Sequence, residues 1–224
     1  MEEVLKLKKY HNLVIAADGS AASGKTTGAK FISKKYGLKF LSSGLLYRYA
    51  SYHLLKHKPK HNISFLKKKF SNLNLKELNN KHLHSPEISA HTSLIAKKPR
   101  IRNILKKFQK KFAKKFNKVC IEGRDIGTVI LPKADIKFFF KCNLDIAAKR
   151  RFKELKKTNK SITFFEVKKA MSIRDNLDKK RENSPLIQAK NAVIVRTDKL
   201  KNIRGMVNKM SGIIEERIKK KYGS

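Results

Sequence analysis

Acidic residues are scarce in this chain of 224 residues, where 17 Asp and Glu stand against 55 Lys and Arg, giving a formal net charge of +38. Such an excess of positive charge can indicate a nucleic-acid partner. It can equally reflect joint enrichment of Lys, Asn, Ile and Phe, as AT-rich codon usage produces, and the lysines are spread over the whole chain. We therefore expect no specific nucleic-acid partner, although the charge would still attract anionic substrates.

Cysteine is also rare, and long apolar runs are missing. The two cysteines, Cys120 and Cys142, lie in or beside predicted core strands, which favours reduced thiols over a disulfide or a zinc site. No apolar stretch approaches the length of a membrane span, and the first twelve residues lack the apolar region of a signal peptide. We expect a cytoplasmic protein without membrane contact, and a monomer.

A glycine-containing loop is the most informative stretch. Residues 19–26 read GSAASGKT and match the phosphate-binding pattern G-x-x-x-x-G-K-[ST] at every fixed position. The glycines let backbone N–H groups face inward, where a Cβ would collide with phosphate oxygens. Lys25 can reach the β- and γ-phosphates of a nucleotide, and the Thr26 hydroxyl can ligate their magnesium ion.

The sequence around this loop has the pattern that the motif requires. An apolar, β-branched run at 13–17 precedes it, as expected for a buried parallel strand. A helical pattern follows and closes at Gly37. The helix would therefore point its N-terminus at the phosphates. We expect the nucleotide phosphates to be held by Gly19, Ser20, Ala21, Ala22, Ser23, Gly24, Lys25, Thr26 and Thr27.

Arginines follow two further predicted strands. A strand at 38–41 leads to Ser43, a candidate helix N-cap, and to Arg48 a turn later. A strand at 118–121 leads to Arg124 and Asp125, at the carboxyl end of a parallel strand, where open α/β sheets bind ligands. A tight turn alone would not require this charged pair.

Two predicted helices also carry charged groups. Arg100 and Arg102 lie in the first turn of a helix opened by Pro99, where cations oppose the helix dipole, and this suggests an anionic partner. Arg174, Asp178 and Arg181 are spaced by four and three, which predicts one shared helical face and is also typical of a surface ion-pair ladder.

Between these motifs, residues 56–84 are polar and rich in Lys, Asn and His, and we expect a small, mobile surface insertion. Its histidines could form a metal face at helical spacing, but Pro59 interrupts them and no Cys or carboxylate joins them. We expect no metal site there.

Taken together, the motifs resemble the bacterial cytidylate kinases, which are nucleoside monophosphate kinases, over nearly the whole chain. The phosphate loop is shared by many families, whereas GRD-x-GT-V followed by P-x-AD, and later RD-x-x-D-x-x-R, is much more specific. The stretches that carry the resemblance are IAADGSAASGKTT, FLSSGLLYR, ISAHTSLIAKKPRIR, VCIEGRDIGTVILPKADIKFFF, DIAAKRRFKEL and IRDNLDKKRENSPL.

This resemblance implies an α/β fold of the P-loop NTPase type, a three-layer sandwich whose five-stranded parallel sheet is flanked by helices. It implies a core at 12–43, 117–149 and 184–224, a nucleotide-monophosphate-binding insert at about 44–116 and an arginine-rich helical lid at about 150–183. The implied reaction is in-line transfer of the γ-phosphoryl group of ATP, with Mg²⁺, to CMP or dCMP, a step of pyrimidine nucleotide metabolism.

Carried over by position, the resemblance also implies roles for individual residues. CMP would be bound by Ser43, Arg48, Ser93, Arg102, Arg124, Asp125, Arg174, Asp178 and Arg181. The transferred group would be stabilised by Lys25, Arg124 and the lid arginines Arg150 and Arg151. Magnesium would be held by Thr26, with Glu122 nearby. The chain departs from the family pattern at Ser42 and Glu122, where Asp is common, and at Ser20, where Pro is frequent.

Two alternative interpretations remain at this level. One is a kinase for another small acceptor, such as UMP, AMP or shikimate. The other is an RNA-associated P-loop protein that uses its basic surface. Arginines placed at strand ends favour a small-molecule pocket over an extended nucleic-acid surface.

Overall fold

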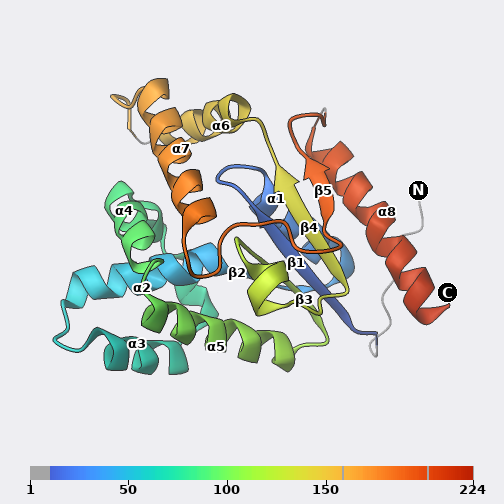
Figure 1. Cartoon of the computed structure of the whole chain (residues 1–224), viewed down its shortest axis with the longest axis horizontal. Coiled ribbons are helices and arrows are strands. Elements are labelled where there is room, and N and C mark those ends of the chain that lie inside the picture. The colour runs from blue at the N-terminus through green and yellow to red at the C-terminus, as the bar shows by residue number, and fades with distance from the viewer. Residues whose placement is uncertain (1–10, 158, 201, 224) are drawn as a thin grey trace. The chain divides into compact units, whose positions relative to one another are not determined.

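The computed structural model describes residues 11–157, 159–200 and 202–223 of the chain (Figure 1). These residues form two compact units. Unit 1 contains the described residues up to Leu41 and those from Phe116 onward, and unit 2 contains Ser42–Lys115. Each unit has its own set of buried apolar side chains. The boundaries expected for the core, the nucleotide-monophosphate-binding insert and the lid stay a prediction.

Unit 1 is built on a five-stranded parallel sheet with the strand order β2-β3-β1-β4-β5. In β1, Ala17 lies opposite Glu122 of β3 and Phe138 of β4, so the carboxyl ends of the three central strands meet at one edge. The predicted five-stranded parallel sheet flanked by helices is confirmed. The strands are β1 (Leu13–Gly19), β2 (Lys39–Ser42), β3 (Lys118–Gly123), β4 (Ile136–Lys141) and β5 (Val193–Arg196).

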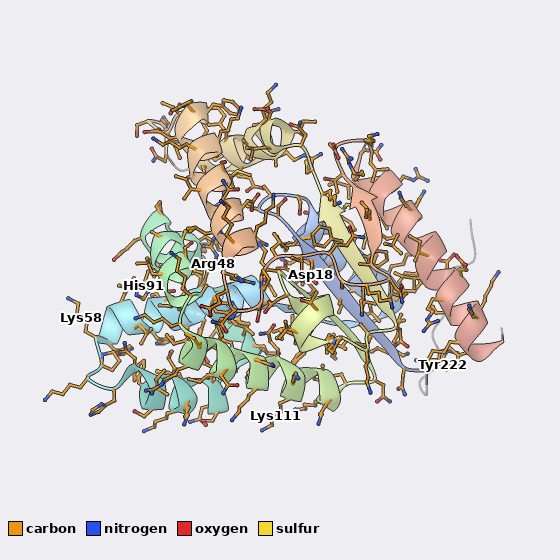
Figure 2. All side chains as sticks on the ribbon, viewed as in Figure 1. Asp18, Arg48, Lys58, His91, Lys111 and Tyr222 are labelled. Carbon is orange, nitrogen blue, oxygen red and sulfur yellow. The ribbon has the colours of Figure 1, made fainter. Side chains whose placement is uncertain are left out.

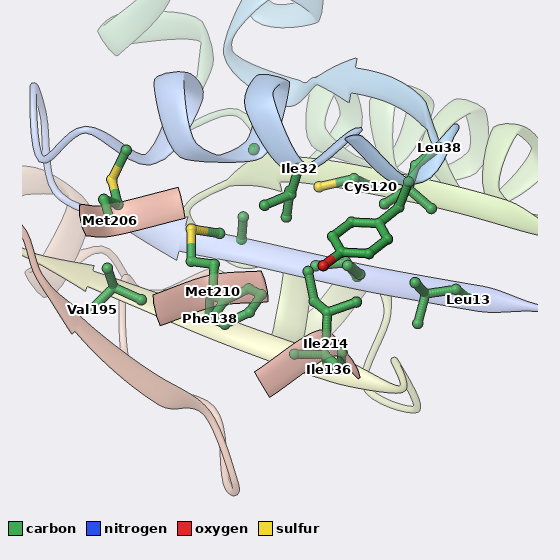
Figure 3. Packing of buried hydrophobic residues seen from close by; sticks show 14 of the residues in the cluster. Leu13, Ile32, Leu38, Cys120, Ile136, Phe138, Val195, Met206, Met210 and Ile214 are labelled. Carbon is green, nitrogen blue, oxygen red and sulfur yellow. The ribbon is translucent and has the colours of Figure 1, made fainter. Parts of the chain in front are cut away.

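One hydrophobic cluster joins this sheet to α1 (Lys25–Tyr36) and α8 (Ile203–Tyr222) (Figure 3). Phe138 of the sheet, Ile32 of α1 and Ile214 of α8 are at most 1% exposed. Burial of side chains of this size contributes about 1.5–3 kcal/mol each. The cluster therefore fixes α1, and with it the loop that precedes α1, against the sheet.

Helix α1 ends at the predicted position. Gly37 adopts a left-handed conformation, φ 64° and ψ 32°, and its N–H donates to the Ser33 carbonyl oxygen. A residue with a Cβ is strained in this region, so glycine is the favoured helix stop. Cys120 is buried in β3 and Cys142 is partly buried after β4, both as free thiols, and burial raises the pKa of Cys120 to about 12.

Two further helices of unit 1, α6 (Leu144–Lys156) and α7 (Phe164–Lys180), pack against each other. Asn143 caps α6 by accepting from the Asp145 and Ile146 backbone amides. Thr163 and Glu166 form a reciprocal capping box at the start of α7. The apolar contact between the helices is made by Ala147, Ala148, Val167 and Met171.

The described ends of the chain meet on unit 1. The Asn12 backbone N–H donates to the Tyr222 hydroxyl over 2.7 Å, and Lys221 Nζ lies 2.7 Å from Asp135 Oδ1. The His11 ring stacks on Tyr222 with centroids 4.1 Å apart. The last turn of α8 is thus tied to the segment that opens β1.

Unit 2 is helical. It contains α2 (Ser43–His57), α3 (Asn62–Ser71), 3-10 turns at Leu75–Asn79 and Lys81–His84, α4 (Pro86–Ile95) and α5 (Pro99–Lys115). Ser85 caps α4, and Pro99 opens α5 as the sequence predicts. Among the residues described in the two units, no helix is both long and apolar enough to cross a membrane.

Two expectations for unit 2 are wrong in detail. Ser42, not Ser43, is the N-cap of α2, because its extended backbone lets its hydroxyl accept the Leu45 amide while Ser43 is already helical. The segment 56–84 is not merely a surface insertion. Its side chains Leu66, Phe70, Leu78 and Leu83 are buried, so it supplies part of the unit's core.

Candidate active site

The phosphate loop connects β1 directly to α1. A Cβ at Gly19 would lie 2.5 Å from the Phe140 carbonyl oxygen, so only glycine fits at the end of β1. Gly24 precedes α1 in a left-handed conformation, φ 82°, which a side chain rarely adopts. Within the loop, the Ser23 hydroxyl donates to the Ser20 carbonyl oxygen over 3.0 Å. Thr26 and Thr27 occupy the first turn of α1, with partly exposed side chains.

Lys25 is buried at the start of α1. Its Nζ donates to the Ser20 carbonyl oxygen over 3.1 Å and lies 4.0 Å from Glu122 Oε2 of β3. Burial and, after it, the charges of Arg124 and Arg174 together lower the pKa of Lys25 to about 7, against the opposing effect of Glu122. The ammonium group is therefore short of negative charge in this structure.

An arginine–carboxylate cluster connects the end of β3 to α7. Arg124 Nε donates to Asp178 Oδ2 over 2.9 Å, and Arg181 Nη1 donates to Asp178 Oδ1 over 3.2 Å. Arg181 Nη2 also lies 3.9 Å from Asp125 Oδ1. Burial alone would raise the pKa of Asp178, but the charges of Arg124 and Arg181 hold it below its usual value. Arg181 takes part although it lies one residue beyond the end of α7.

Arg174 lies on α7 close to this cluster and is partly buried. It interacts electrostatically with Arg124, Asp178 and Asp175, and it makes no hydrogen bond or ion pair with any residue that the structure describes. Its neighbour Asp175 accepts from the Ala21 backbone amide over 2.9 Å and so ties α7 to the phosphate loop. Asp175 is part of the RD-x-x-D-x-x-R motif, but sequence reasoning assigned it no role.

Asp18 is a second residue that sequence reasoning left without a role. It precedes Gly19 in β1, and Figure 2 labels it at the sheet. Its two carboxylate oxygens accept from the Ile126 and Gly127 amides over 2.8 and 2.7 Å. These amides open the π-helical turn Ile126–Ile130 that follows Arg124 and Asp125. Asp18 thereby fixes the charged turn beside the phosphate loop.

The expected lid arginines lie in different surroundings. Arg150 donates to the hydroxyl and the carbonyl oxygen of Thr197 over 3.1 and 3.0 Å, and Thr197 in turn donates to the Ser23 carbonyl oxygen over 2.9 Å. Arg151 pairs with Glu154 at 2.9 Å on the surface of α6. The structure therefore connects Arg150 to the phosphate loop through Thr197, and Arg151 to its own helix.

The remaining expected substrate residues belong to unit 2. Arg48 donates to the Leu83 carbonyl oxygen and the Ser89 hydroxyl, over 2.7 and 2.8 Å. Arg102 is buried, donates to the Ala96 carbonyl oxygen and lies over the Tyr47 ring. Ser43 is buried in the first turn of α2, and the Ser93 hydroxyl lies 3.4 Å from the Ser89 carbonyl oxygen.

The donor set of the loop suits a magnesium nucleotide better than a free metal ion. Within the described residues there is no cluster of three or more His, Cys, Asp or Glu side chains that could hold a metal ion alone. The loop closed by Gly19 and Gly24, with Lys25 and the N-terminus of α1, matches a chain of phosphates. A metal ion brought by those phosphates would need only Thr26 and a carboxylate such as Glu122.

A parallel sheet with this loop between its first strand and first helix defines a P-loop nucleotide-binding protein. Comparison with known families is more specific. The family model described as cytidylate kinase matches residues 15–216, and the chain belongs to this family.

Curated relatives agree with this assignment. Cytidylate kinase of Thermosipho melanesiensis is 36% identical over 215 residues, covering 92% of this chain and 98% of the relative. That of Bartonella tribocorum is 40% identical over 192 residues, covering 84% and 87%. Among solved structures, an uncharacterized protein from Eubacterium ventriosum aligns with a TM-score of 0.53 at 16% identity, covering 92% of this chain and 98% of that one, and supports the fold alone.

Proposed function

We propose that this protein is a (d)CMP kinase that transfers the γ-phosphoryl group of ATP to CMP and dCMP, producing CDP and dCDP. Membership of the cytidylate kinase family and the curated cytidylate kinases among its relatives support phosphorylation of CMP by ATP. A kinase for UMP, AMP or shikimate and an RNA-associated P-loop protein are not favoured by these relatives. Use of dCMP is the finer part of the proposal.

The observation that carries the proposal is the group of cations around Lys25. Burial and the charge of Arg124 lower the pKa of both Lys25 and Arg174, and Arg174 also lowers that of Lys25. Of the three, only Arg124 has a carboxylate at hydrogen-bond distance among the described residues. Phosphate groups would supply the missing negative charge and accept forked hydrogen bonds from the arginines. A site of this kind suits a reaction in which phosphates are both donor and acceptor.

On the donor side, the loop residues Gly19–Thr27 would hold the phosphates of ATP through their backbone N–H groups, with the helix dipole of α1 behind them. Thr26 and Glu122 would hold Mg²⁺, which supplies charge neutralisation between the phosphates when bound. The Ser23 carbonyl oxygen is fixed by Thr197, and the Ala21 amide by Asp175, so the loop is held in shape before nucleotide binds.

On the acceptor side, Arg48 and Arg124 would grip the phosphate of CMP. Ser93 and Asp125 would accept from the cytosine amino group, and Arg102 and Arg181 would donate to the acceptor edge of the base. Arg174 and Asp178 would hold the sugar, and Ser43 would lie at the start of α2 near the acceptor. These assignments rest on the resemblance together with the hydrogen-bonding capacity of each side chain.

The chemistry requires positioning more than acid–base catalysis. The acceptor phosphate is already ionised at neutral pH, so its oxygen can attack without a strong general base. Lys25, Arg124 and the lid arginines Arg150 and Arg151 would neutralise the charge that develops during transfer. In this structure Arg150 is bonded to Thr197, so it would have to exchange that partner for phosphate oxygens when the substrates bind.

The test is ADP production from ATP with CMP, dCMP, UMP, AMP, shikimate or no acceptor, each with Mg²⁺. Rapid turnover with CMP and dCMP and little with the others is the expected result. A preference for UMP, AMP or shikimate would replace the acceptor assignment. If no small acceptor raises ATP turnover above its background, the kinase proposal fails.

A further inference from the structure

Nearly all charged side chains of unit 2 are positive. Its 74 residues, Ser42–Lys115, include nineteen Lys and Arg but only two acidic residues, Glu77 and Glu87. Glu77 is engaged in a capping box and accepts from the Tyr49 hydroxyl, and Glu87 lies in the first turn of α4. Both acidic groups of this unit thus lie in the first turn of a helix or 3-10 turn.

The exposed side of α5 is strongly cationic. Arg100, Lys107, Lys110, Lys111 and Lys114 are all exposed, and at 100° per residue they fall within an arc of about 100°. We call these five residues the α5 cationic face. Figure 2 shows Lys111 on the outward side of this helix. The opposite side of α5 is apolar and buried, with Ile101, Ile104, Leu105 and Phe112 in the core of unit 2.

No member of this face makes a hydrogen bond or ion pair with any residue that the structure describes. A few lysines elsewhere do pair with carboxylates, as Lys35 does with Glu215 and Lys221 does with Asp135. Like charges four residues apart, such as Lys107 and Lys111, also destabilise the helix that carries them. None of these five residues is assigned to the phosphoryl-transfer site. The helix therefore bears a repulsion that an external polyanion would relieve.

The residue types on the α5 cationic face indicate which kind of partner it can bind. Membrane-surface helices insert apolar side chains, yet no large apolar side chain is exposed on α3 or α5 among the described residues. Protein interfaces are depleted in lysine and have an apolar centre. Single-stranded nucleic acids are held largely by stacking on aromatic groups, which this face also lacks. What remains is a partner that offers only closely spaced phosphates.

We infer that the α5 cationic face binds the phosphodiester backbone of double-stranded nucleic acid, without reading its sequence. Exposed Lys67 and Lys68 on α3, which packs against α5, add positive charge on the neighbouring helix. Because the contacts are to phosphate alone, RNA and DNA duplexes should bind with similar affinity. This activity is separate from phosphoryl transfer and does not depend on the proposed function.

The experiment measures binding of a fluorescent 24-base-pair duplex to the full chain by anisotropy at several KCl concentrations. In the face variant, Lys107, Lys110, Lys111 and Lys114 are all changed to Gln, a residue that keeps helix propensity. The matched control changes Lys34, Lys209, Lys219 and Lys220 to Gln, which removes the same charge from exposed positions of α1 and α8. Both variants are expected to keep the far-ultraviolet circular dichroism spectrum of the unmodified protein, which shows that they fold.

The face variant should bind the duplex at least about tenfold more weakly near 100 mM salt, and the slope of log K against log[KCl] should fall by roughly 3 to 4. The control should change both quantities much less. Equal losses in the two variants would mean that the overall charge attracts the duplex, and would overturn the inference. It would also be overturned by tighter binding to anionic vesicles or single strands than to duplex, or by a tenfold preference between RNA and DNA.

Discussion

At the scale of single residues, the site is characterised by charges held in places that disfavour them. Lys25 is buried with its nearest carboxylate oxygen 4.0 Å away, and Asp18 is buried with two backbone amides as its hydrogen-bond donors. Both groups would be more stable in water. Each is retained in a position that orders the phosphate loop or the charged turn beside it.

Replacing Lys25 or Arg124 with Ala should lower kcat for CMP phosphorylation by at least about a hundredfold, because each removes a positive charge from the transferred phosphoryl group. Steady-state turnover with saturating ATP and CMP measures the effect. Lys219→Ala and Arg204→Ala, both exposed on α8, are the matched controls and should leave turnover unchanged. Near-normal turnover of either site variant, with a folded circular dichroism spectrum, would contradict the assigned role.

Asp18 should make the stability of the protein depend on pH. Burial raises its pKa from 3.8 to about 6, although the Gly127 and Ile126 amides oppose that rise. The folded protein then binds this proton more tightly than the unfolded chain, so the stabilisation is fully present below about pH 4 and is lost as pH rises through about 6. The loss amounts to about 3 kcal/mol at most.

Urea unfolding of the unmodified protein and of Asp18→Asn between pH 4 and 7.5 tests this, since titrations common to both proteins cancel. The excess stability of the unmodified protein should shrink as pH rises, because Asn has no proton to lose. A difference that is constant over this range would show that the Asp18 pKa is not raised.

At the scale of elements, α1 and α8 are held together by close contact around a glycine. A Cβ on Gly28 of α1 would lie 3.0 Å from Phe140 Cε1 and 3.1 Å from Met210 Sδ of α8. A Cβ on Gly212 of α8 would have nothing within 4 Å. Packing therefore requires glycine at position 28, whereas the surroundings of position 212 leave room for a side chain.

Gly28→Ala should therefore destabilise the protein by about 1–3 kcal/mol through overpacking. Gly212→Ala should stabilise it by about 0.5–1 kcal/mol, because alanine is the better helix former. Urea denaturation followed by circular dichroism gives both values on the same background. Equal effects of the two substitutions would mean that the contact between α1 and Phe140 relaxes freely.

The elements themselves were largely predictable from sequence. Strong local signals, such as the apolar run at 13–17, Gly37 after α1 and Pro99 at the start of α5, gave correct types and approximate ends. Local signals fail where neighbours are equivalent, so the adjacent serines at 42 and 43 could not reveal which one caps α2. The polar segment 56–84 contains short amphipathic pieces, but their local pattern did not show that Leu66, Phe70 and Leu78 are buried in a core.

The candidate site was predictable only as a set of motifs. The phosphate loop and the Arg124–Asp125 pair each have a recognisable local pattern. The contacts that join them do not, because Asp18 lies 108 residues from Ile126 and Arg124 lies 54 residues from Asp178. Such pairings depend on strand order, and no local spacing in the sequence encodes them.

At the scale of the whole molecule, the dominant property is the charge of +38. Both proposed substrates are anions, so they should be attracted to the protein over distances comparable with the Debye length, about 10 Å at 0.1 M salt. Salt screens this attraction, and the screening weakens encounter and binding, whereas the chemical step takes place inside the site.

We therefore expect kcat/KM for CMP to fall by roughly tenfold or more between 50 and 500 mM KCl, while kcat changes much less. Initial rates over a range of CMP concentrations at each salt concentration measure both quantities. Sucrose at matched osmolality serves as the control for non-ionic effects. A kcat/KM that is insensitive to KCl would show that the net charge has no part in substrate capture.

The contact between the two described ends of unit 1 also makes a circular permutation of the chain feasible. Asn12 and Tyr222 are hydrogen-bonded, so a short linker could join the chain near these residues. New termini could then open in the exposed turn at 72–74, between α3 and the 3-10 turn Leu75–Asn79. Such a circular permutant would keep every strand pairing while unit 2 alone became discontinuous in sequence.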